Sequence, residues 1–212
     1  INNDLQSNQK MFRLLQGDVG SGKTIVALIS ALNVINSGFQ VAVMAPTEIL
    51  ARQHYTLAKK LFKHSIKVEL LSSKSEYSKK RDIINGLYEK DIDIVFGTHA
   101  IFQNKIQFKK LGLIVIDEQH KFGVNQRKKL SDKGGYNCDI LLMTATPIPR
   151  TLTMTLYGDM DLSIIREKPK LRKPIKTYSK LENKIEDVIN FIKKEINLGN
   201  QIFWVCPLIE ES

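Results

Sequence analysis

Residues 17–24 of the chain read Gly17-Asp18-Val19-Gly20-Ser21-Gly22-Lys23-Thr24, which satisfies the pattern G-x-x-x-x-G-K-[ST] at every fixed position. Glycines in such a stretch let successive backbone N–H groups turn inward around phosphate oxygens, and a helix beginning near Lys23 would add its positive end. Lys23 is expected to reach the terminal phosphates of a nucleotide, and the Thr24 hydroxyl to bind Mg²⁺. The predicted nucleotide-binding residues are Gly17, Asp18, Val19, Gly20, Ser21, Gly22, Lys23 and Thr24.

On either side of this loop, short apolar runs alternate with longer helical patterns. An apolar repeat at helical spacing covers residues 25–35, and Thr47 is placed to cap a second helix whose stripe includes His54. The runs predicted as strands are apolar almost throughout, as expected of strands covered on both faces. The alternation predicts an α/β fold, a doubly wound and mainly parallel sheet with helices on both faces. The predicted strands are residues 11–15, 41–45, 68–71, 92–96, 113–116 and 140–143.

A basic stretch at residues 166–176 divides the chain, with six basic residues, one acid and two prolines. This composition is typical of a linker. A second α/β lobe of about 40 residues cannot bury a core of its own, so it is expected to be incomplete. The predicted domains are 1–165, a linker at 166–174, and the start of the second lobe at 175–212. Within that lobe the predicted elements are a strand at 175–178, a helix at about 182–197 and a strand at 202–205.

Composition limits the class of protein. The chain has 212 residues, 42% of them apolar, and a formal net charge of +10. No apolar run approaches the roughly 20 residues that a membrane helix needs. We therefore predict a cytoplasmic protein without membrane contact, in which the distant cysteines Cys138 and Cys206 stay reduced. The basic balance favours a nucleic-acid partner, although lysine-rich surfaces also serve solubility.

Two acids, Asp117 and Glu118, follow the apolar run at residues 113–116. They would lie at the carboxyl edge of the sheet, where ligands bind in such folds. There Asp117 would hold Mg²⁺ through water, and Glu118 would deprotonate the attacking water. Adjacent acids after a strand often only cap the next helix. Together with the glycine-rich loop, however, they predict a catalytic set of Lys23, Asp117 and Glu118.

Threonine-bearing segments follow three predicted strands, at residues 45–48, 97–100 and 144–146. Backbone N–H groups and Thr hydroxyls in such positions are suited to grip the phosphates of a nucleic-acid strand lying over the sheet edge. Taken singly, each segment is better explained as a turn or a helix cap.

Taken in order, these segments resemble the motifs of superfamily 2 helicases. Residues 19–24 resemble motif I, and the others resemble motifs Ia (45–48), Ib (97–99), II (117–120) and III (144–146). Within that superfamily the chain is most similar to the RecG family, in the blocks 14–20, 117–124, 144–151 and 204–212. The transcription-repair coupling factors share most of these blocks. Their second motif usually reads D-E-E-H, whereas this chain has Gln119.

The resemblance implies a P-loop NTPase fold of two RecA-like lobes with ATP and Mg²⁺ in the cleft. It implies movement on duplex DNA and remodelling of branched DNA, including stalled forks and Holliday junctions. It assigns nucleotide–DNA coupling to Gln119, His120, Thr144 and Thr146. It assigns DNA contacts to Pro46, Thr47, Gly97, Thr98 and His99.

Three parts of such helicases are missing from these 212 residues. They are the fork-splitting wedge domain, the adenine-reading segment and the arginine-bearing motif of the second lobe. We therefore expect a fragment that binds nucleotide but shows little DNA-stimulated hydrolysis and no unwinding.

Other classes of function fit parts of the pattern. A P-loop kinase acting on a small molecule would carry an arginine-bearing lid soon after the loop, and no convincing one is seen. A nucleic-acid-binding module with a vestigial nucleotide site would not need Lys23, Thr24, Asp117 and Glu118 all intact. Among the motors, a coupling-factor-like duplex translocase is the alternative to a RecG-like helicase.

Overall fold

The computed structural model describes residues 1–62, 65–72, 75–103, 105–118, 138–146, 160–167 and 175–205. The chain forms two compact units, Ile1–Lys170 and Leu171–Ser212. The boundary between the units falls inside the basic stretch that the sequence predicts to be a linker.

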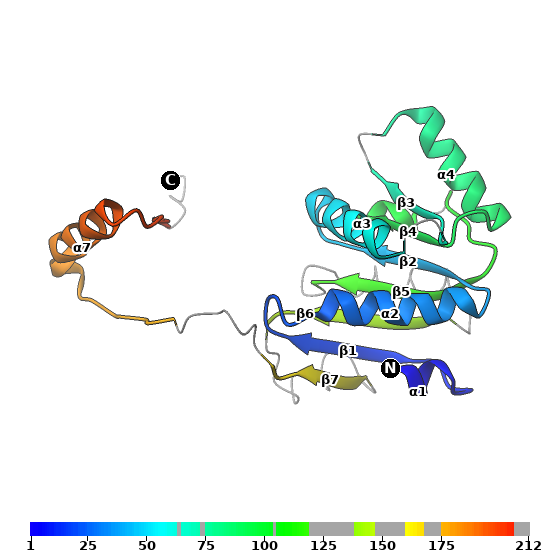
Figure 1. Ribbon diagram of the computed structural model, residues 1–212, viewed down its shortest axis with the longest axis horizontal. Helices are drawn as coiled ribbons and strands as arrows, with labels where there is room; N and C mark the ends of the chain where they lie inside the picture. Colours follow the sequence, from blue (N-terminus) through cyan, green and yellow to red (C-terminus); the bar gives the residue numbers. More distant parts are fainter. Residues whose placement is uncertain are drawn as a thin grey trace, which may run out of the picture. The chain divides into compact units, whose positions relative to one another are not determined.

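A parallel sheet forms the centre of the first unit. Its strands are β1 (Phe12–Gly17), β2 (Gln40–Met44), β3 (Val68–Leu71), β4 (Ile94–Gly97), β5 (Leu111–Asp117), β6 (Asp139–Thr144) and β7 (Asp161–Ile165). In the described residues the strands follow the order β3-β4-β2-β5-β6-β1-β7, and each neighbouring pair is parallel. The strand arrows in Figure 1 accordingly point one way.

Helices cover both faces of this sheet. The helical segments of the first unit are α1 (Asn2–Leu5), α2 (Lys23–Asn36), α3 (Glu48–Phe62), α4 (Tyr77–Glu89) and the 3-10 helix η1 (His99–Phe102). Residues of α2 and α3 share one apolar cluster, and residues of α4 and η1 share the other. Alternate strand residues supply the two layers: Val41 and Val43 face the first, and Ala42 and Met44 the second. The predicted doubly wound fold is confirmed.

The six strands predicted from the sequence are present, with ends that differ by two residues or fewer. Four elements of the described first unit were not predicted: the short helical segments α1 and η1, helix α4 and strand β7. Strand β7 pairs with β1 at the edge of the sheet, and its partly exposed residues form no continuous apolar run. Helix α4 buries only Ile83 and Leu87. Because the rest of its sequence is mostly polar, the apolar pattern does not predict a helix there.

The apolar repeat in α2 is only partly the buried face. Ala27, Leu28 and Ala31 lie against the sheet, whereas Ile25 and Ile29 are 41% and 52% exposed. The inward face is therefore built largely of small residues, which let a helix approach a sheet closely. The stripe predicted from the largest apolar side chains is wrong for Ile25 and Ile29.

In the second unit, the predicted helix is present as η3 (Glu182–Lys184) followed by α7 (Ile185–Asn197). Residues 175–178 and 202–205 were predicted as strands and are not strands. A strand needs a neighbour to pair its backbone N–H and C=O groups, and the described residues of this unit include no other strand. In the described part of the whole chain, no helix is both long and apolar enough to cross a membrane.

Candidate nucleotide-binding site

The predicted site residues that the structure describes lie at the carboxyl ends of the strands. Gln16, just before the loop, is in register with Thr144 at the end of β6. Asp117 at the end of β5 is in register with Met143 of the same strand. Strands β6 and β5 lie between β1 and β2, so the chain crosses over them at this point. Ligands of such sheets bind outside the carboxyl ends of the strands, at crossings of this type.

The glycine-rich loop has the backbone geometry that its sequence predicts. Gly20 and Gly22 have φ angles of 79° and 97°, in the left-handed region that glycine adopts without strain. A Cβ at Gly17 would lie 2.5 Å from Oγ of Ser21 and 3.1 Å from Cβ of Ile165. The loop therefore packs tightly against the end of β7, and a larger residue at position 17 would displace it.

The glycine-rich loop contains backbone N–H groups that could donate hydrogen bonds to a bound anion. In the described part of the chain, the structure gives no intramolecular partner to the N–H groups of Gly20, Gly22, Lys23 and Thr24. The Ser21 hydroxyl oxygen is likewise buried without a hydrogen bond to any described residue. The Lys23 Nζ donates to the carbonyl oxygens of Gly17, at 2.7 Å, and Asp18, at 3.1 Å. Unpaired N–H groups at a helix N-terminus beside an ammonium group fit the phosphates of a nucleotide.

Asp117 and Glu118 end β5, as predicted, but Asp117 has an unpredicted partner. Oδ2 of Asp117 lies 2.8 Å from Nε2 of His54 on α3, and both side chains are buried. The backbone N–H of Glu118 donates to Oδ1 of Asp117 at 3.1 Å. The Asp117 carboxylate is therefore held through both oxygens at the sheet edge.

Thr144 and Thr146 are brought together by the turn after β6. Their hydroxyl oxygens are 2.9 Å apart, and the Thr146 N–H donates to the Thr144 hydroxyl at 3.2 Å. Gln16, the register partner of Thr144, has its Oε1 buried without a hydrogen bond in the described residues. Motif III thus adjoins the strand that carries the phosphate loop.

The segment after β2 begins α3 as the sequence predicts. The Thr47 hydroxyl accepts a hydrogen bond from the Leu50 N–H at 3.3 Å, so Thr47 caps the helix. Glu48 accepts a hydrogen bond from the Ser72 hydroxyl after β3, and Arg52 lies 3.7 Å from the same carboxylate. Pro46 is half-buried and Thr47 is exposed.

The segment after β4 is held close to β3. A Cβ at Gly97 would lie 2.8 Å from the carbonyl oxygen of Leu71 and 2.9 Å from Cγ1 of Ile101, so this position requires glycine. Thr98 precedes η1 and is half-buried, and His99 is exposed. The predicted coupling residues Gln119 and His120 lie outside the described residues.

Three polar side chains lie in or beside this candidate site although the sequence did not predict them there: His54, Ser72 and Gln16. His54 places a polar imidazole ring in an otherwise apolar helical stripe. This mismatch was the one feature of the sequence that could have identified His54 as a site residue. Ser72 and Gln16 follow or end strands, but nothing local distinguishes them from ordinary polar residues.

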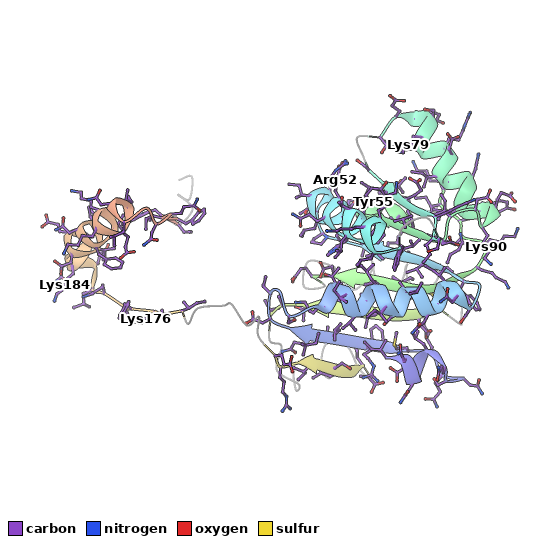
Figure 2. All side chains as sticks on the ribbon, in the orientation of Figure 1. Arg52, Tyr55, Lys79, Lys90, Lys176 and Lys184 are labelled. Carbon is purple, nitrogen blue, oxygen red and sulfur yellow. The ribbon has the colours of Figure 1, made fainter. Side chains whose placement is uncertain are left out.

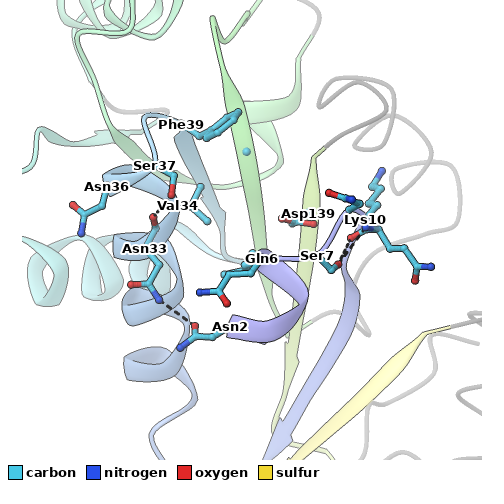
Figure 3. A pocket seen from close by; sticks show the side chains of 14 residues that line it. Asn2, Gln6, Ser7, Lys10, Asn33, Val34, Asn36, Ser37, Phe39 and Asp139 are labelled. Atoms are coloured by element: carbon cyan, nitrogen blue, oxygen red, sulfur yellow. Dashed lines mark hydrogen bonds between the residues drawn. The ribbon is translucent and has the colours of Figure 1, made fainter.

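A separate hollow lies at the other end of the strands, where the strands begin (Figure 3). Its volume is about 650 Å³, and α1, the end of α2 and the starts of strands line it. Lys10, Phe39 and Asp139 are among its residues, each at or just before the start of a strand. Because the phosphate loop follows the carboxyl end of β1, this hollow is not the nucleotide site.

Comparison with known proteins identifies the class. The sequence matches the DEAD/DEAH box helicase family over residues 2–155. The chain belongs to this family of helicases.

Within that class, the chain is similar to proteins named ATP-dependent DNA helicase RecG. It is 49% identical to RecG of Bacillus subtilis over 213 aligned residues, covering 100% of this chain and 31% of that protein. It is also 49% identical to RecG of Aquifex aeolicus, covering 99% of this chain and 27% of that protein. The chain thus spans less than a third of the length of these relatives.

Solved structures of helicases also match the chain. RecG bound to a three-way DNA junction matches with a TM-score of 0.82 and 43% identity, over 98% of this chain and 28% of that one. The Pyrococcus furiosus Hef helicase domain matches with a TM-score of 0.59 at 18% identity, covering 77% of this chain and 37% of that one, which supports the fold alone. These findings confirm the predicted RecG resemblance and leave the P-loop kinase interpretation without support.

Proposed function

We propose that this chain is the ATP-binding lobe of a RecG-like motor that couples ATP hydrolysis to remodelling of branched DNA in recombination and repair. The observation that carries the proposal is the convergence of the phosphate loop, the Asp117-Glu118 pair and the Thr144–Thr146 turn at one sheet edge. Support for the DNA structure comes from the matching RecG structure, which is bound to a three-way junction.

The residues of the site suit ATP hydrolysis with Mg²⁺. The loop N–H groups and Lys23 would hold the phosphates, with Lys23 exchanging its carbonyl partners for phosphate oxygens. Thr24 and Asp117 would hold Mg²⁺, which supplies charge neutralisation to the phosphates when bound. Glu118 would take the proton of the attacking water.

DNA would lie over the same edge of the sheet. In the turns holding Pro46-Thr47 and Gly97-Thr98-His99, the exposed residues Thr47 and His99 would contact DNA phosphates. Gln119, His120, Thr144 and Thr146 would connect these contacts to the nucleotide. Such contacts carry no base specificity, which suits a motor that acts on DNA of any sequence.

The domain assignment is part of the proposal. Residues 1–165 form the first RecA-like lobe, residues 166–174 a basic linker and residues 175–212 the beginning of the second lobe. In the whole protein we expect a wedge domain and the rest of the second lobe to act with this chain. A DNA-remodelling motor of this kind belongs in the cytoplasm.

Nucleotide binding by the purified chain tests the proposal. Calorimetry with Mg²⁺ and ATP should show binding that Lys23→Ala weakens at least tenfold, because charge-assisted hydrogen bonds contribute about 1.5–3 kcal/mol. Lys79→Ala, which removes an exposed lysine on α4, should bind as the wild type does. Affinity of Lys23→Ala within a factor of about two of the wild type would remove Lys23 from the site.

A further inference from the structure

His54 lies on the face of α3 that packs against the sheet, in a stripe otherwise formed by Ala51, Ala58 and Phe62. Its Nε2 is 2.8 Å from Oδ2 of Asp117. The exposed fractions of the two residues are 9% and 8%. A polar ring has therefore been buried beside the carboxylate that ends β5, where apolar residues fill the rest of the interface.

This contact restricts the Asp117 carboxylate. An ionised carboxylate has no hydrogen to give, so the imidazole is the donor. The Glu118 N–H occupies the other oxygen at 3.1 Å. Each carboxylate oxygen has a second lone pair, so both can still accept a hydrogen bond from a metal-bound water. Hydrogen-bond partners of this kind orient metal-binding carboxylates, and their loss typically costs about 10–100-fold in metal affinity or activity.

From this geometry we infer that His54 is a positioning residue for the magnesium site. It holds the Asp117 carboxylate in the orientation that accepts Mg²⁺ when nucleotide binds, and it acts through Asp117 rather than by contact with the metal. The inference rests on the proposed function, because it takes Asp117 as the carboxylate that holds Mg²⁺. It also connects the magnesium site to α3, whose first turn follows the proposed DNA contacts Pro46 and Thr47.

The test is ADP binding to the purified chain by calorimetry, once with Mg²⁺ and once with EDTA. The ratio of the two dissociation constants measures what Mg²⁺ contributes to binding, independently of catalysis. His54→Leu removes the donor and keeps apolar bulk, whereas His54→Gln keeps an N–H donor of similar reach. Gln53→Leu makes the same change to leucine at the exposed neighbouring position and serves as the matched control.

We expect His54→Leu to reduce the Mg²⁺ contribution about tenfold without changing ADP affinity in EDTA. His54→Gln should restore most of the contribution, and Gln53→Leu should equal the wild type. Wild-type Mg²⁺ dependence in His54→Leu would overturn the inference. So would a stronger dependence, because His54 would then compete with the metal.

Two further results separate the possible failures. If the wild-type chain does not bind ADP at all, the proposed nucleotide site is wrong. If it binds ADP equally well with and without Mg²⁺, the nucleotide site stands, but the proposed magnesium site is wrong and the inference falls with it. Circular dichroism checks folding of each variant. If His54→Leu does not fold, His54→Asn replaces it, because its shorter amide cannot reach Asp117, and the same reduction is expected.

Discussion

Glu118, the proposed catalytic base, has an uncommon backbone conformation. Its φ angle is 52°, in the left-handed region that non-glycine residues rarely adopt. The turn follows directly from β5, and the Glu118 N–H bonds the Asp117 carboxylate. Such conformations persist where the surrounding structure determines them, and they concentrate at functional sites. An uncommon conformation directly after Asp117 is consistent with the proposal that Asp117 holds a metal and Glu118 acts on a water.

Glu118→Gln tests this division of roles. In the whole protein with DNA present, we expect ATP to bind with unchanged affinity and turnover to fall about 10²–10⁴-fold, because the amide keeps the shape and removes the base. Steady-state hydrolysis and nucleotide binding are the measurements. Glu89→Gln, at an exposed position on α4, should hydrolyse ATP at the wild-type rate. Wild-type turnover by Glu118→Gln would end its assignment as the base.

Asp139 gives a residue-scale prediction about stability. Burial raises the pKa of its carboxyl above the ordinary value of 3.8, although the Met11 N–H that donates to Oδ1 at 2.7 Å acts in the opposite direction. The folded chain therefore keeps this proton to a higher pH than the unfolded chain does. The resulting stabilisation is fully present below the unfolded pKa and is lost as the pH rises through the folded pKa.

Asp139→Asn should abolish that contribution, because the amide does not titrate and its oxygen can still accept from Met11. Urea unfolding at several pH values from 3 upward would measure it. The free energy of unfolding of the wild type, minus that of the variant, should fall as the pH rises above 3.8 and then level off. A difference that rises with pH would show that the folded pKa is lowered.

At the scale of elements, the helices and strands that are most deeply buried are the ones that the sequence predicts best. All seven residues of β5 are buried, so composition alone marks the strand. Within the described residues strand β7 pairs on one side only and is partly exposed, and its pattern does not distinguish it from a loop. In the second unit the helix is predictable from its spacing, whereas the two predicted strands needed partners that a local pattern cannot supply.

The parts of the candidate site also differ in how well the sequence predicts them. The phosphate loop is carried by consecutive residues, so its sequence specifies both its chemistry and its φ angles. The His54–Asp117 pair joins residues 63 apart, and it exists only because α3, which packs against β3 and β4, brings His54 to the carboxyl end of β5. A local motif predicts the carboxylate, but the donor that orients it depends on how helix and sheet pack.

Two glycines provide a matched test of packing between elements. At Gly97 an added Cβ would meet the Leu71 carbonyl oxygen of β3 at 2.8 Å, and that backbone atom cannot move aside cheaply. We expect Gly97→Ala to lower the free energy of unfolding by about 1–3 kcal/mol. Urea denaturation with a measured m-value is the appropriate assay.

Gly86→Ala is the control for this substitution. Its added Cβ would meet Cδ1 of Ile92, also at 2.8 Å, but that atom is the end of a flexible side chain. Alanine also has the higher helix propensity by about 1 kcal/mol, so the net change should be small. Equal losses in the two variants would show that the β3–β4 contact is not what excludes a side chain at position 97.

At the scale of the whole molecule, charge is the dominant feature. The chain has 32 Lys and Arg residues against 22 Asp and Glu residues. Labelled basic side chains appear on both units in Figure 2, including Arg52 and Lys79 on the first and Lys176 and Lys184 on the second. If DNA is held through phosphates, its binding releases counterions and must weaken as salt rises. Net charge alone would produce the same trend, so a test must separate a specific contact surface from a general excess of lysine.

The decisive prediction concerns the basic stretch at residues 166–176. Fluorescence anisotropy with duplex and branched DNA at several salt concentrations should give a log–log slope of about −0.9 for each phosphate neutralised, and we expect at least three such phosphates. Changing Arg166, Lys168, Lys170 and Arg172 to Gln should make this slope shallower by about 0.9 for each phosphate that the variant no longer neutralises. Changing Lys180, Lys184, Lys193 and Lys194 to Gln removes the same charge in and beside α7 and should leave the slope nearly unchanged. Equal effects of the two sets would mean that net charge, not the linker, attracts DNA. A slope near zero, or tight binding to one sequence only, would contradict phosphate-based binding altogether.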